Sequence, residues 1–259
     1  MKLTVSDLRF SYGTHTVLSG VDFSLSQGEM MSVLGTNGTG KTTLFKCILG
    51  FLPQYAGSIQ IDGEEARSLH PRELAKRIAY IPQNHQQSFG YSVLDMILMG
   101  TAHSLSLFSL PGETQKKDAY AALERLGIAH LAEKNIGRIS GGEQQLVLIA
   151  RALAQKAKLL IMDEPTASLE YGNQDRVMQL VNGLAQDGYS ILLSTHNPQH
   201  ALWYSDHVLA LKGGHVLAKG EPDDIITTSF LRDLYGMEAA LLDTPGGKII
   251  VPARTPKSN

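Results

Sequence analysis

The sequence predicts an α/β fold in which a mostly parallel sheet carries an inserted helical segment. Two nearly uninterrupted apolar runs, at 159–162 and 190–193, have the character of strands that are buried on both faces. Between these runs, four apolar residues recur at the spacing of one helix face: Val177, Leu180, Val181 and Leu184. Strand–helix–strand alternation of this kind forms a parallel sheet with helices on its faces.

The other elements follow in chain order. We expect strands over 2–10, 17–25 and 29–34, then a glycine-rich loop and a helix from Lys41 to about Leu49. Two further strands are expected over 57–63, which ends in an Asp-Gly turn, and over 77–83. From about 84 to 150 the pattern is helical, and one helix face is marked by Ala119, Ala122, Leu123 and Leu126. The tail predicts a small hairpin through 243–247 and a frayed end over 252–259.

The length, charge and cysteine content of the chain argue against several classes of protein, among them nucleic-acid-binding and disulfide-rich proteins. The chain has 259 residues, 43% of them hydrophobic, which is enough for a large core and one compact unit. A net charge of −2 gives no basic surplus for nucleic acid, and no polybasic block suits a membrane surface. The one cysteine, Cys47, excludes an intramolecular disulfide and fits a reducing cytosol. The sequence has neither an apolar N-terminal leader nor an apolar run of about 18 residues, so we expect a soluble protein.

Residues 35–42 read Gly-Thr-Asn-Gly-Thr-Gly-Lys-Thr and match the phosphate-binding pattern G-x-x-x-x-G-K-[ST]. The segment follows an apolar strand and opens a helix, which is the context that the pattern requires. Its glycines let backbone N–H groups converge on phosphate oxygens at a helix N-terminus. Lys41 would reach the β- and γ-phosphates, and the Thr42 hydroxyl would ligate Mg²⁺. The alternative is a glycine-rich turn with an exposed lysine.

Polar residues stand at the ends of three other predicted strands. Asp163 and Glu164 end the run at 159–162, at the sheet edge where α/β folds bind ligands. Asp163 would hold the Mg²⁺ shell, and Glu164 would polarise an attacking water. His196 ends the next apolar strand and would contact a γ-phosphate, whereas Gln83 alone gives a weaker signal. The alternatives are an ordinary Asp-Glu-Pro turn, a surface histidine and a loop glutamine.

A second phosphate-facing helix start is predicted at 140–144, Ser-Gly-Gly-Glu-Gln, in front of another apolar run. Ser140 offers a hydroxyl, and Gly141 and Gly142 expose backbone N–H groups, but the segment has no lysine. The alternative is a helix cap, with Ser140 as the N-cap and Glu143 completing a capping box. Both interpretations can hold at once.

Together these motifs resemble the ATPase subunit of ATP-binding-cassette (ABC) transporters over about residues 1–225. The matching positions are the P-loop (35–42), the Q-loop Gln83, the signature (140–144), the Walker B end (Asp163 and Glu164), the switch His196 and an adenine-stacking Tyr12. For Tyr12 the alternative is an ordinary strand-end tyrosine. The resemblance implies a RecA-like P-loop NTPase core, an N-terminal antiparallel β subdomain and an inserted helical subdomain.

The resemblance implies ATP and Mg²⁺ as cofactors. It implies catalytic roles for Glu164, His196 and Gln83, and metal contacts from Thr42, Gln83 and Asp163. It implies nucleotide contacts from Tyr12, Gly35, Thr36, Asn37, Gly38, Thr39, Gly40, Lys41, Thr42, Thr43, Ser140, Gly141, Gly142 and Glu143. In this family two ATPase subunits pack head to tail, so that each ATP lies between the P-loop of one and the signature of the other. Hydrolysis then lets the dimer open.

The sequence departs from the family pattern at two positions. Ile139 begins the signature where leucine is usual, which exchanges one apolar residue for another. Glu170 ends the D-loop where aspartate is usual, so the sequence does not decide how this loop communicates between the subunits. We expect the core over 1–83 and 151–225, the helical signature subdomain over 84–150 and a C-terminal tail over 226–259.

The resemblance also implies integral-membrane permease subunits and a peripheral position on the cytoplasmic face of the cell membrane. A docking cluster for a permease helix, or alternatively part of the subdomain core, is formed by Phe89, Tyr91, Val93 and Leu94. The amino-acid sequence of residues 70–83, 91–100 and 144–153 is most similar to that of ATPase subunits from importers of iron–siderophore, haem, cobalamin and related metal chelates. In that group a substrate-binding protein delivers the cargo.

Three other functions stay open at this point. The first is an importer of molybdate or another metal. The second is a soluble ABC ATPase that acts on ribosomes or DNA, although such proteins usually fuse two cassettes or insert a long coiled coil, and no nucleic acid is expected here. The third is a P-loop kinase of a small molecule, which would leave 140–144 and His196 unexplained.

Overall fold

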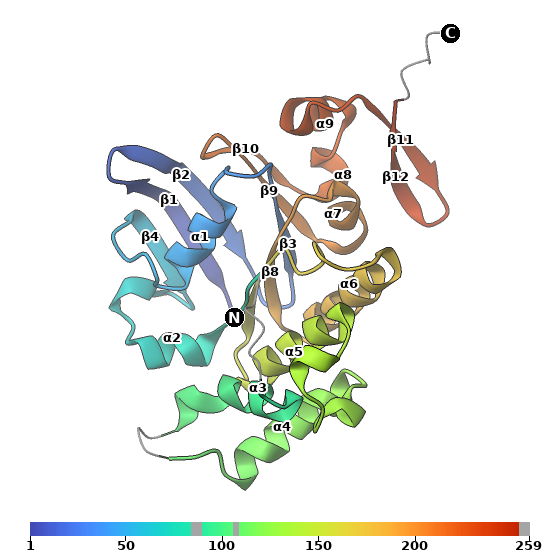
Figure 1. Cartoon of the computed structure of the whole chain (residues 1–259). Helices are drawn as coiled ribbons and strands as arrows, with labels where there is room; N and C mark the ends of the chain where they lie inside the picture. Colours follow the sequence, from blue (N-terminus) through green and yellow to red (C-terminus); the bar gives the residue numbers. More distant parts are fainter. Residues whose placement is uncertain (84–89, 106–108, 254–259) are drawn as a thin grey trace.

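The computed structural model describes residues 1–83, 90–105 and 109–253, and its layers are visible in Figure 1. A six-stranded sheet in the order β10-β9-β3-β8-β7-β6 forms the centre. Its strands are β3 (Met30–Leu34), β6 (Ile78–Ile81), β7 (Leu159–Asp163), β8 (Ser190–Thr195), β9 (His207–Lys212) and β10 (His215–Gly220). The edge strand β10 is antiparallel to β9, and the other neighbouring pairs of this sheet are parallel. The predicted mostly parallel sheet is confirmed.

A second, antiparallel sheet lies at the N-terminal side, in the order β2-β1-β4-β5. Its strands are β1 (Leu3–Tyr12), β2 (His15–Leu25), β4 (Ala56–Ile61) and β5 (Glu64–Glu65). Asp62 and Gly63 join β4 to β5 with φ angles of 52° and 83°, the left-handed backbone that an Asp-Gly turn supplies. The predicted tail hairpin consists of β11 (Ala239–Thr244) and β12 (Gly247–Pro252). Of the predicted frayed end, residues 254–259 lie outside the described residues.

The helices are α1 (Lys41–Ile48), α2 (Pro71–Arg77), α3 (Val93–Leu98), α4 (Glu113–Arg125), α5 (Gly141–Ala154), α6 (Tyr171–Gln186), α7 (Pro198–Tyr204), α8 (Pro222–Ile225) and α9 (Thr228–Tyr235). Short 3-10 helices occupy Ala66–Ser68, Met99–Ser104, Ala129–Leu131 and Ile136–Arg138. Within the described ranges, no helix combines the length and apolar character that crossing a bilayer requires.

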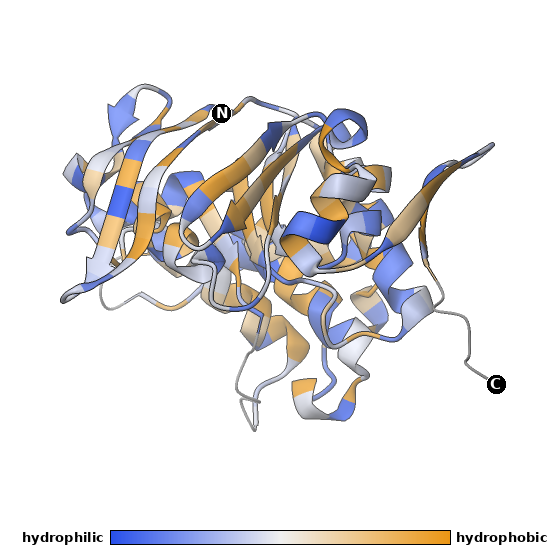
Figure 2. Cartoon of the chain, turned by 90° about the horizontal axis from the view of Figure 1, so that it is seen from above, coloured by the Kyte–Doolittle hydropathy of each residue, from blue (hydrophilic) through white to orange (hydrophobic). Residues whose placement is uncertain are grey.

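Successive side chains of the central strands pack into two different hydrophobic cores, one on each face of the sheet. In β7, Leu159 and Ile161 pack with α1 and the antiparallel sheet, whereas Leu160 and Met162 pack with α3, α4, α5 and α6. This division follows from the two-residue period of a strand, which sends neighbouring side chains to opposite faces. Figure 2 shows the hydrophobic colour gathered on the central strands. The apolar runs therefore belong to strands buried on both faces, as predicted.

The topology brings three chain segments to one edge of the central sheet. Strands β3, β7 and β8 are parallel neighbours in the order β3-β8-β7, so their carboxyl ends meet at the same edge. The loop 35–40 follows β3, Glu164 follows β7, and His196 follows β8. This edge holds the loop 35–40, Asp163, Glu164 and His196, which the sequence singled out.

Candidate functional site

The loop 35–40 is held tightly against its surroundings before it opens α1. A Cβ atom on Gly35 would lie 2.5 Å from Thr39 Oγ1 and 2.7 Å from the Leu211 carbonyl oxygen. Gly40 has φ 102°, and a Cβ there would lie 2.8 Å from Leu18 Cδ2 on β2. Thr39 Oγ1 donates to the Thr36 carbonyl at 2.9 Å. Glycine at these two positions is required by close packing, and at Gly40 also by the left-handed backbone.

The Lys41 ammonium lies buried inside this loop. Its Nζ donates to the carbonyl oxygens of Gly35 (2.7 Å) and Thr36 (3.1 Å) and lies 3.8 Å from Glu164 Oε1. Burial lowers the pKa of Lys41, and the nearby carboxylates of Glu164 and Asp163 oppose that shift. The exposed-lysine alternative is therefore wrong, since the ammonium points into the loop and toward the carboxylates.

A chain of hydrogen bonds joins the start of α1 to the ends of β7 and β8. Thr42 Oγ1 donates to Asp163 Oδ2 at 2.9 Å, and Ser194 Oγ donates to Asp163 Oδ1 at 2.6 Å. The Glu164 backbone N–H in turn donates to Ser194 Oγ at 2.9 Å. The sequence prediction missed Ser194. A usable signal existed, because pairing the two apolar runs as parallel neighbours sets Asp163 opposite Ser194.

The Glu164 carboxylate is surrounded by three polar side chains. Gln83 Nε2 donates to Glu164 Oε2 at 2.8 Å, and His196 Nδ1 lies 3.4 Å from the same oxygen. Lys41 approaches the other oxygen, as described above. The Glu164 backbone has φ 47°, a left-handed conformation that is strained for a non-glycine residue and that clusters at functional sites. The structure thus brings Lys41, Gln83, Glu164 and His196 together from four segments.

A cavity of about 320 Å³ opens beside these groups. Its lining comes from β2, the loop, α1, the Gln83 segment and the end of β7: Val17, Asn37, Gly38, Thr39, Gly40, Lys41, Thr42, Thr43, Gln83 and Glu164. Tyr12 does not line it. Tyr12 is 47% exposed at the end of β1 and meets the Phe10 ring edge-on at 4.9 Å. Phosphate groups match this cavity because it combines a buried ammonium with backbone N–H groups at a helix start.

The oxygen atoms of this site that could ligate a metal suit a small, hard cation. Two of these atoms are the Thr42 hydroxyl and the Asp163 carboxylate oxygen, which are joined by a hydrogen bond. The Gln83 amide bonds Glu164 through its nitrogen, which leaves its oxygen available, the amide orientation being assigned from that hydrogen bond. Oxygen ligands of this kind suit Mg²⁺, which keeps several water or phosphate ligands of its own. Among the described residues, no group of three or more His, Cys, Asp or Glu could hold a metal alone.

The start of α5 forms a separate helix-end site. The Glu143 N–H donates to Ser140 Oγ at 3.3 Å, and the Ser140 N–H donates to Glu143 Oε2 at 2.7 Å, which completes the predicted capping box. These bonds with Ser140 lower the pKa of the Glu143 carboxyl. A Cβ on Gly141 would meet no atom within 4 Å, so this N-terminus is open on one side.

A small hollow of about 230 Å³ lies at this helix start. Its lining residues are Ser140, Gly142, Glu143, Leu146, Asn173, Arg176 and Val177, of which the last three come from α6. The sequence prediction missed Asn173 and Arg176, since no pattern gives the orientation of α6 against α5. The hollow shares no lining residue with the cavity beside Lys41. Within one chain, the helix starts at Lys41 and at Ser140 therefore do not form one site.

The two departures from the family pattern have defined places. Ile139 is buried in the core shared with α5, so isoleucine replaces leucine at an apolar contact. Glu170 is the exposed residue before α6 and makes no side-chain cap there.

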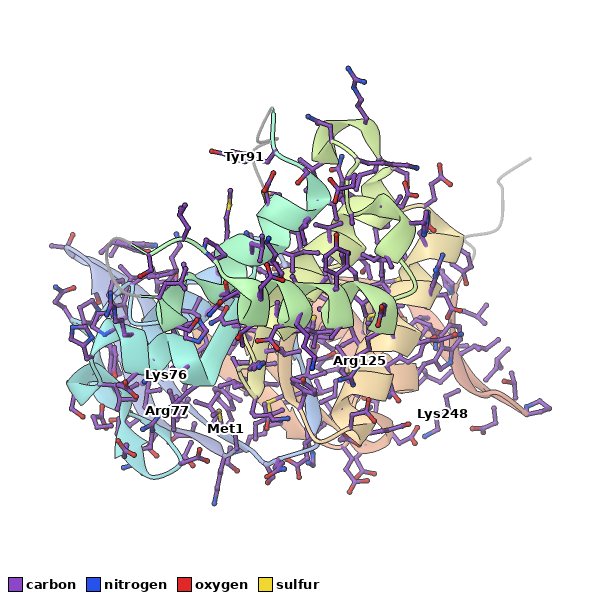
Figure 3. All side chains as sticks on the ribbon, turned by 90° about the horizontal axis from the view of Figure 1, so that it is seen from below. Met1, Lys76, Arg77, Tyr91, Arg125 and Lys248 are labelled. Atoms are coloured by element: carbon purple, nitrogen blue, oxygen red, sulfur yellow. The ribbon has the colours of Figure 1, made fainter. Side chains whose placement is uncertain are left out.

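The predicted docking cluster divides between surface and core. Tyr91 is 46% exposed and projects outward in Figure 3. Val93 is buried in the helical core and Leu94 packs against it, which is the alternative interpretation. Phe89 lies outside the described residues.

The similarity to known proteins reaches beyond the site and covers nearly the whole chain. A family model described as ABC transporter matches residues 18–167. An ABC transporter ATP-binding protein of Haemophilus influenzae, described as uncharacterized, is 39% identical over 93% of this chain and 92% of its own length. The hemin import ATP-binding protein HmuV of Deinococcus radiodurans is 38% identical over 94% and 93%. A probable iron chelatin transport ATP-binding protein of Helicobacter pylori is 38% identical over 91% and 93%.

Solved structures agree with the sequence relatives. An inward-facing metal-chelate type ABC transporter aligns with a TM-score of 0.85 and 31% identity over 98% of both chains. The ADP conformation of an ATP-binding cassette aligns with a TM-score of 0.82 and 28% identity over 91% of this chain and 98% of the other. The predicted P-loop core, antiparallel subdomain and helical insertion are confirmed. The chain belongs to the ABC transporter family, as its ATP-binding and ATP-hydrolysing subunit.

Proposed function

We propose that the chain drives an ABC importer of a metal chelate, such as an iron–siderophore, haem or a cobalamin-like compound, through separate permease subunits. The observation that carries this proposal is the near full-length similarity to subunits named for hemin and iron chelatin transport. Import of molybdate or another metal is the alternative within the same family. The ribosome, DNA and kinase alternatives would leave this similarity without a reason.

In the proposed site, ATP phosphates lie in the cavity beside Lys41. Backbone N–H groups of 35–43 and the Lys41 ammonium would bind the β- and γ-phosphates in place of the loop carbonyls that Lys41 now contacts. Tyr12 would stack on the adenine, which its exposure on the same hairpin as Val17 supports. Thr42, Gln83 and Asp163 would hold Mg²⁺, which when bound neutralises charge on the phosphates.

Glu164 is the proposed general base for the attacking water. It stands at a strained strand end, close to the phosphate cavity, and its position is fixed by Ser194. Gln83 would orient the Glu164 carboxylate, and His196 would donate toward the γ-phosphate. Gln83 and His196 both approach the Glu164 carboxylate, so a water bound to that carboxylate would lie close to all three side chains.

Completion of the site by a second subunit is supported by the two separate cavities. The Ser140 hydroxyl and the N–H groups of Gly141 and Gly142 would reach the γ-phosphate held by the partner's P-loop. The hollow at Ser140 shares no wall with the chain's own phosphate cavity, as a site completed between subunits requires. Hydrolysis would then release the contact between the subunits.

The remaining parts of the proposal concern organisation. Residues 1–83 with 151–225 would form the nucleotide-binding core, 84–150 the helical signature subdomain and 226–259 the tail, with α5 running across position 150 from one part into the other. The chain would work as a dimer on permease subunits at the cytoplasmic face of the cell membrane, supplied by a substrate-binding protein.

Glu164→Gln tests the catalytic assignment. The amide keeps the size of the side chain but cannot accept the water proton, so we expect hydrolysis to fall by about 10²–10⁴-fold while ATP binding is retained. An ATP-bound dimer should then persist in size-exclusion chromatography. The matched control is Glu73→Gln on the exposed face of α2, which should leave turnover unchanged. Unchanged turnover in Glu164→Gln would remove this residue from its role.

The transport assignment needs its own measurement. Cells that lack the chain should lose uptake of one labelled metal chelate and regain it with the wild-type chain but not with Glu164→Gln. Uptake of all tested chelates at the wild-type rate would contradict the proposed importer.

A further inference from the structure

The C-terminal hairpin is attached to α7, the helix that begins two residues after His196 (Figure 1). Among the described residues, β12 pairs with β11 alone, so the backbone groups on its other edge need other partners. Gln199 of α7 supplies them. Its Nε2 donates to the Lys248 carbonyl at 2.9 Å, and its Oε1 accepts the Ile250 N–H at 2.7 Å, an amide orientation that both bonds require. Trp203 Nε1 donates to the same Lys248 carbonyl at 3.1 Å.

Apolar packing and a second helix hold α7 from its other sides. Ile250 of the hairpin packs in one hydrophobic core with Ala201 of α7, which is fully buried. Toward α6, the Tyr204 hydroxyl donates to Asp175, and the Tyr204 carbonyl accepts Asn182 Nδ2 at 3.0 Å. The helix is therefore fixed between α6 and the hairpin.

The first turn of α7 connects this attachment to His196. The Gln199 N–H donates to Asn197 Oδ1 at 3.0 Å, and the Asn197 N–H donates to Thr195 Oγ1 at 3.0 Å. His196 lies between these bonded residues. Its side chain is 58% exposed and, within the described part of the chain, has Glu164 as its one ion-pair or hydrogen-bond partner. A side chain with so few contacts is positioned chiefly by its own backbone.

The hairpin has no direct contact with the phosphate cavity. No residue of 239–252 is among the described residues that line the cavity beside Lys41, and neither Gln199 nor Trp203 lines it. An effect of the hairpin on the reaction would therefore have to pass through α7. The path is short, because only Asn197 and Pro198 separate His196 from Gln199.

We infer that Gln199 is a positioning residue, which anchors the first turn of α7 to the C-terminal hairpin and thereby holds His196 within reach of Glu164 and the γ-phosphate. Without the two side-chain bonds, the first turn of α7 can shift, and His196 shifts with it. Small displacements of a proton donor cost much in rate, since donor and acceptor must lie within hydrogen-bond distance. The role of His196 rests on the proposed function, whereas the attachment of α7 to the hairpin does not.

Gln199→Met tests the inference. Methionine keeps the length of the side chain but removes both hydrogen bonds to β12. We expect kcat for ATP hydrolysis, measured per folded molecule, to fall about tenfold, with an unchanged KM for ATP because the hairpin does not touch the cavity. Gln186→Met is the matched control, since Gln186 Nε2 bonds Asn182 Oδ1 at 2.9 Å within α6 and has no bond to the hairpin. A wild-type kcat in Gln199→Met overturns the inference.

A double-mutant cycle identifies the route of the effect. His196→Ala alone should lower kcat, and Gln199→Met should lower it no further in that background, because Gln199 acts through His196. If the two losses multiply, the hairpin acts by another route and the inference fails, while the proposed role of His196 stands. A wild-type kcat in His196→Ala would instead refute the proposed role of His196, on which the inference rests.

Trp203→Phe separates positioning from stability, and it also serves if Gln199→Met does not fold. Phenylalanine keeps an aromatic ring but removes one of the three bonds to the hairpin. The variant should show a smaller loss of kcat than Gln199→Met, and this loss should again be absent in the His196→Ala background. A lower melting temperature with a wild-type kcat in both variants would make the hairpin a structural support only and would overturn the inference.

Discussion

At the scale of single residues, Ser194 links the two carboxylates of the site to the strand that carries His196. Its hydroxyl donates to Asp163 and accepts the Glu164 N–H, and the side chain is fully buried. Because the hydroxyl uses donor and acceptor at once, it fixes the spacing between the proposed metal ligand and the proposed base. The strained Glu164 backbone is held by this bond.

Ser194→Ala should therefore reduce turnover more than stability alone explains. We expect ATPase activity to fall about tenfold or more, because a small displacement of Glu164 misplaces the water. The control is Ser190→Ala on the same strand, which is equally buried and donates to the Met1 carbonyl at 2.7 Å. Each variant should lose about 1–3 kcal/mol in the free energy of unfolding, measured with urea. Equal ATPase activities in the two variants would contradict the positioning role.

Several site residues could be placed from the sequence because they stand at the end of an apolar strand or in the loop that follows it. Asp163, Glu164 and His196 needed only the expectation that parallel strands end at one edge, and Lys41 was given by the phosphate-binding pattern of residues 35–42. Ser194 was missed because its role depends on the register between β7 and β8. Single-strand patterns carry no register, although the pairing of the two runs could have suggested it. The chemical roles of these residues remain predictions.

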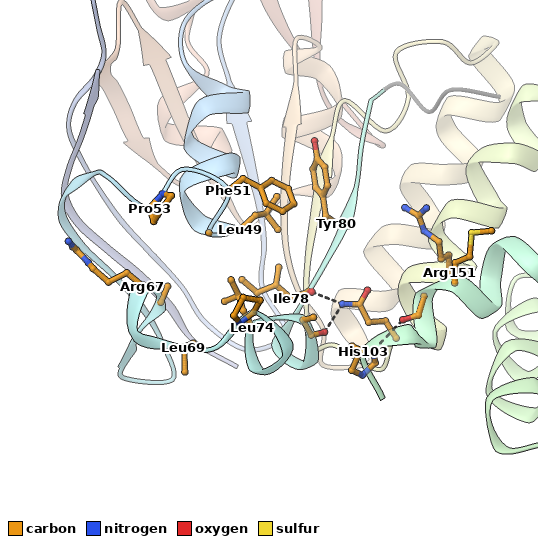
Figure 4. Close-up of a pocket in the computed structure, with 17 residues that line it drawn as sticks. Leu49, Phe51, Pro53, Arg67, Leu69, Leu74, Ile78, Tyr80, His103 and Arg151 are labelled. Carbon is orange, nitrogen blue, oxygen red and sulfur yellow. Dashed lines mark hydrogen bonds between the residues drawn. The ribbon is translucent and has the colours of Figure 1, made fainter. Parts of the chain in front are cut away.

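At the scale of elements, α5 carries two surfaces with different tasks. Its first turn forms the capping box at Ser140, whereas Arg151 in its last turn and its C-cap residue Gln155 line a separate cavity of about 700 Å³ (Figure 4). The capping box could be read from Ser140 and Glu143 because its spacing is local. The contacts of α5 with Asn173 and with Gly100 could not, since they depend on how helices distant in the sequence cross.

Ser140→Arg should leave ATP binding by the isolated chain intact and block the ATP-bound dimer. The longer, charged side chain would fill the hollow that the partner's γ-phosphate needs to approach. Loss of the N-cap should also cost about 1 kcal/mol. Ser92→Arg is the control, because Ser92 caps α3 through the same kind of box with Asp95 but lines neither the hollow at Ser140 nor the cavity beside Lys41. Dimerisation, measured with the Glu164→Gln background by analytical ultracentrifugation, should be lost only in Ser140→Arg. Loss of nucleotide binding in that variant would instead place Ser140 in the chain's own site.

At the scale of the whole molecule, the central sheet separates two large cores and makes both depend on it. The alternation seen in β7 recurs in β8, where Leu192 faces the α1 side while Ile191 and Leu193 face the helical side. The buried side chains of α3, α4 and α5 pack against the central sheet as well as against one another. This alternation within continuous apolar runs is why the sequence could predict a doubly covered sheet but not which helices cover each face.

Cys47 should report the unfolding of this assembly. The thiol is fully buried in α1, and burial raises its pKa to about 12. At pH 8 the native thiol is therefore both inaccessible and protonated, so we expect no reaction with iodoacetamide in the folded chain and rapid reaction in urea. Mass spectrometry of the labelled chain checks this, with Cys47→Ala as the blank. Rapid labelling of the native protein would show that the α1 side opens independently of global unfolding.

The carbonyl oxygens that hold Lys41 have a thermodynamic consequence for ligand binding. The ammonium is already fixed inside the loop by Gly35 and Thr36, and the loop is already closed by the Thr39 side chain. An incoming anion then exchanges hydrogen-bond partners on an ordered frame, and little chain entropy is lost on association. The binding enthalpy should reflect this exchange, because the loop itself does not have to fold around the ligand.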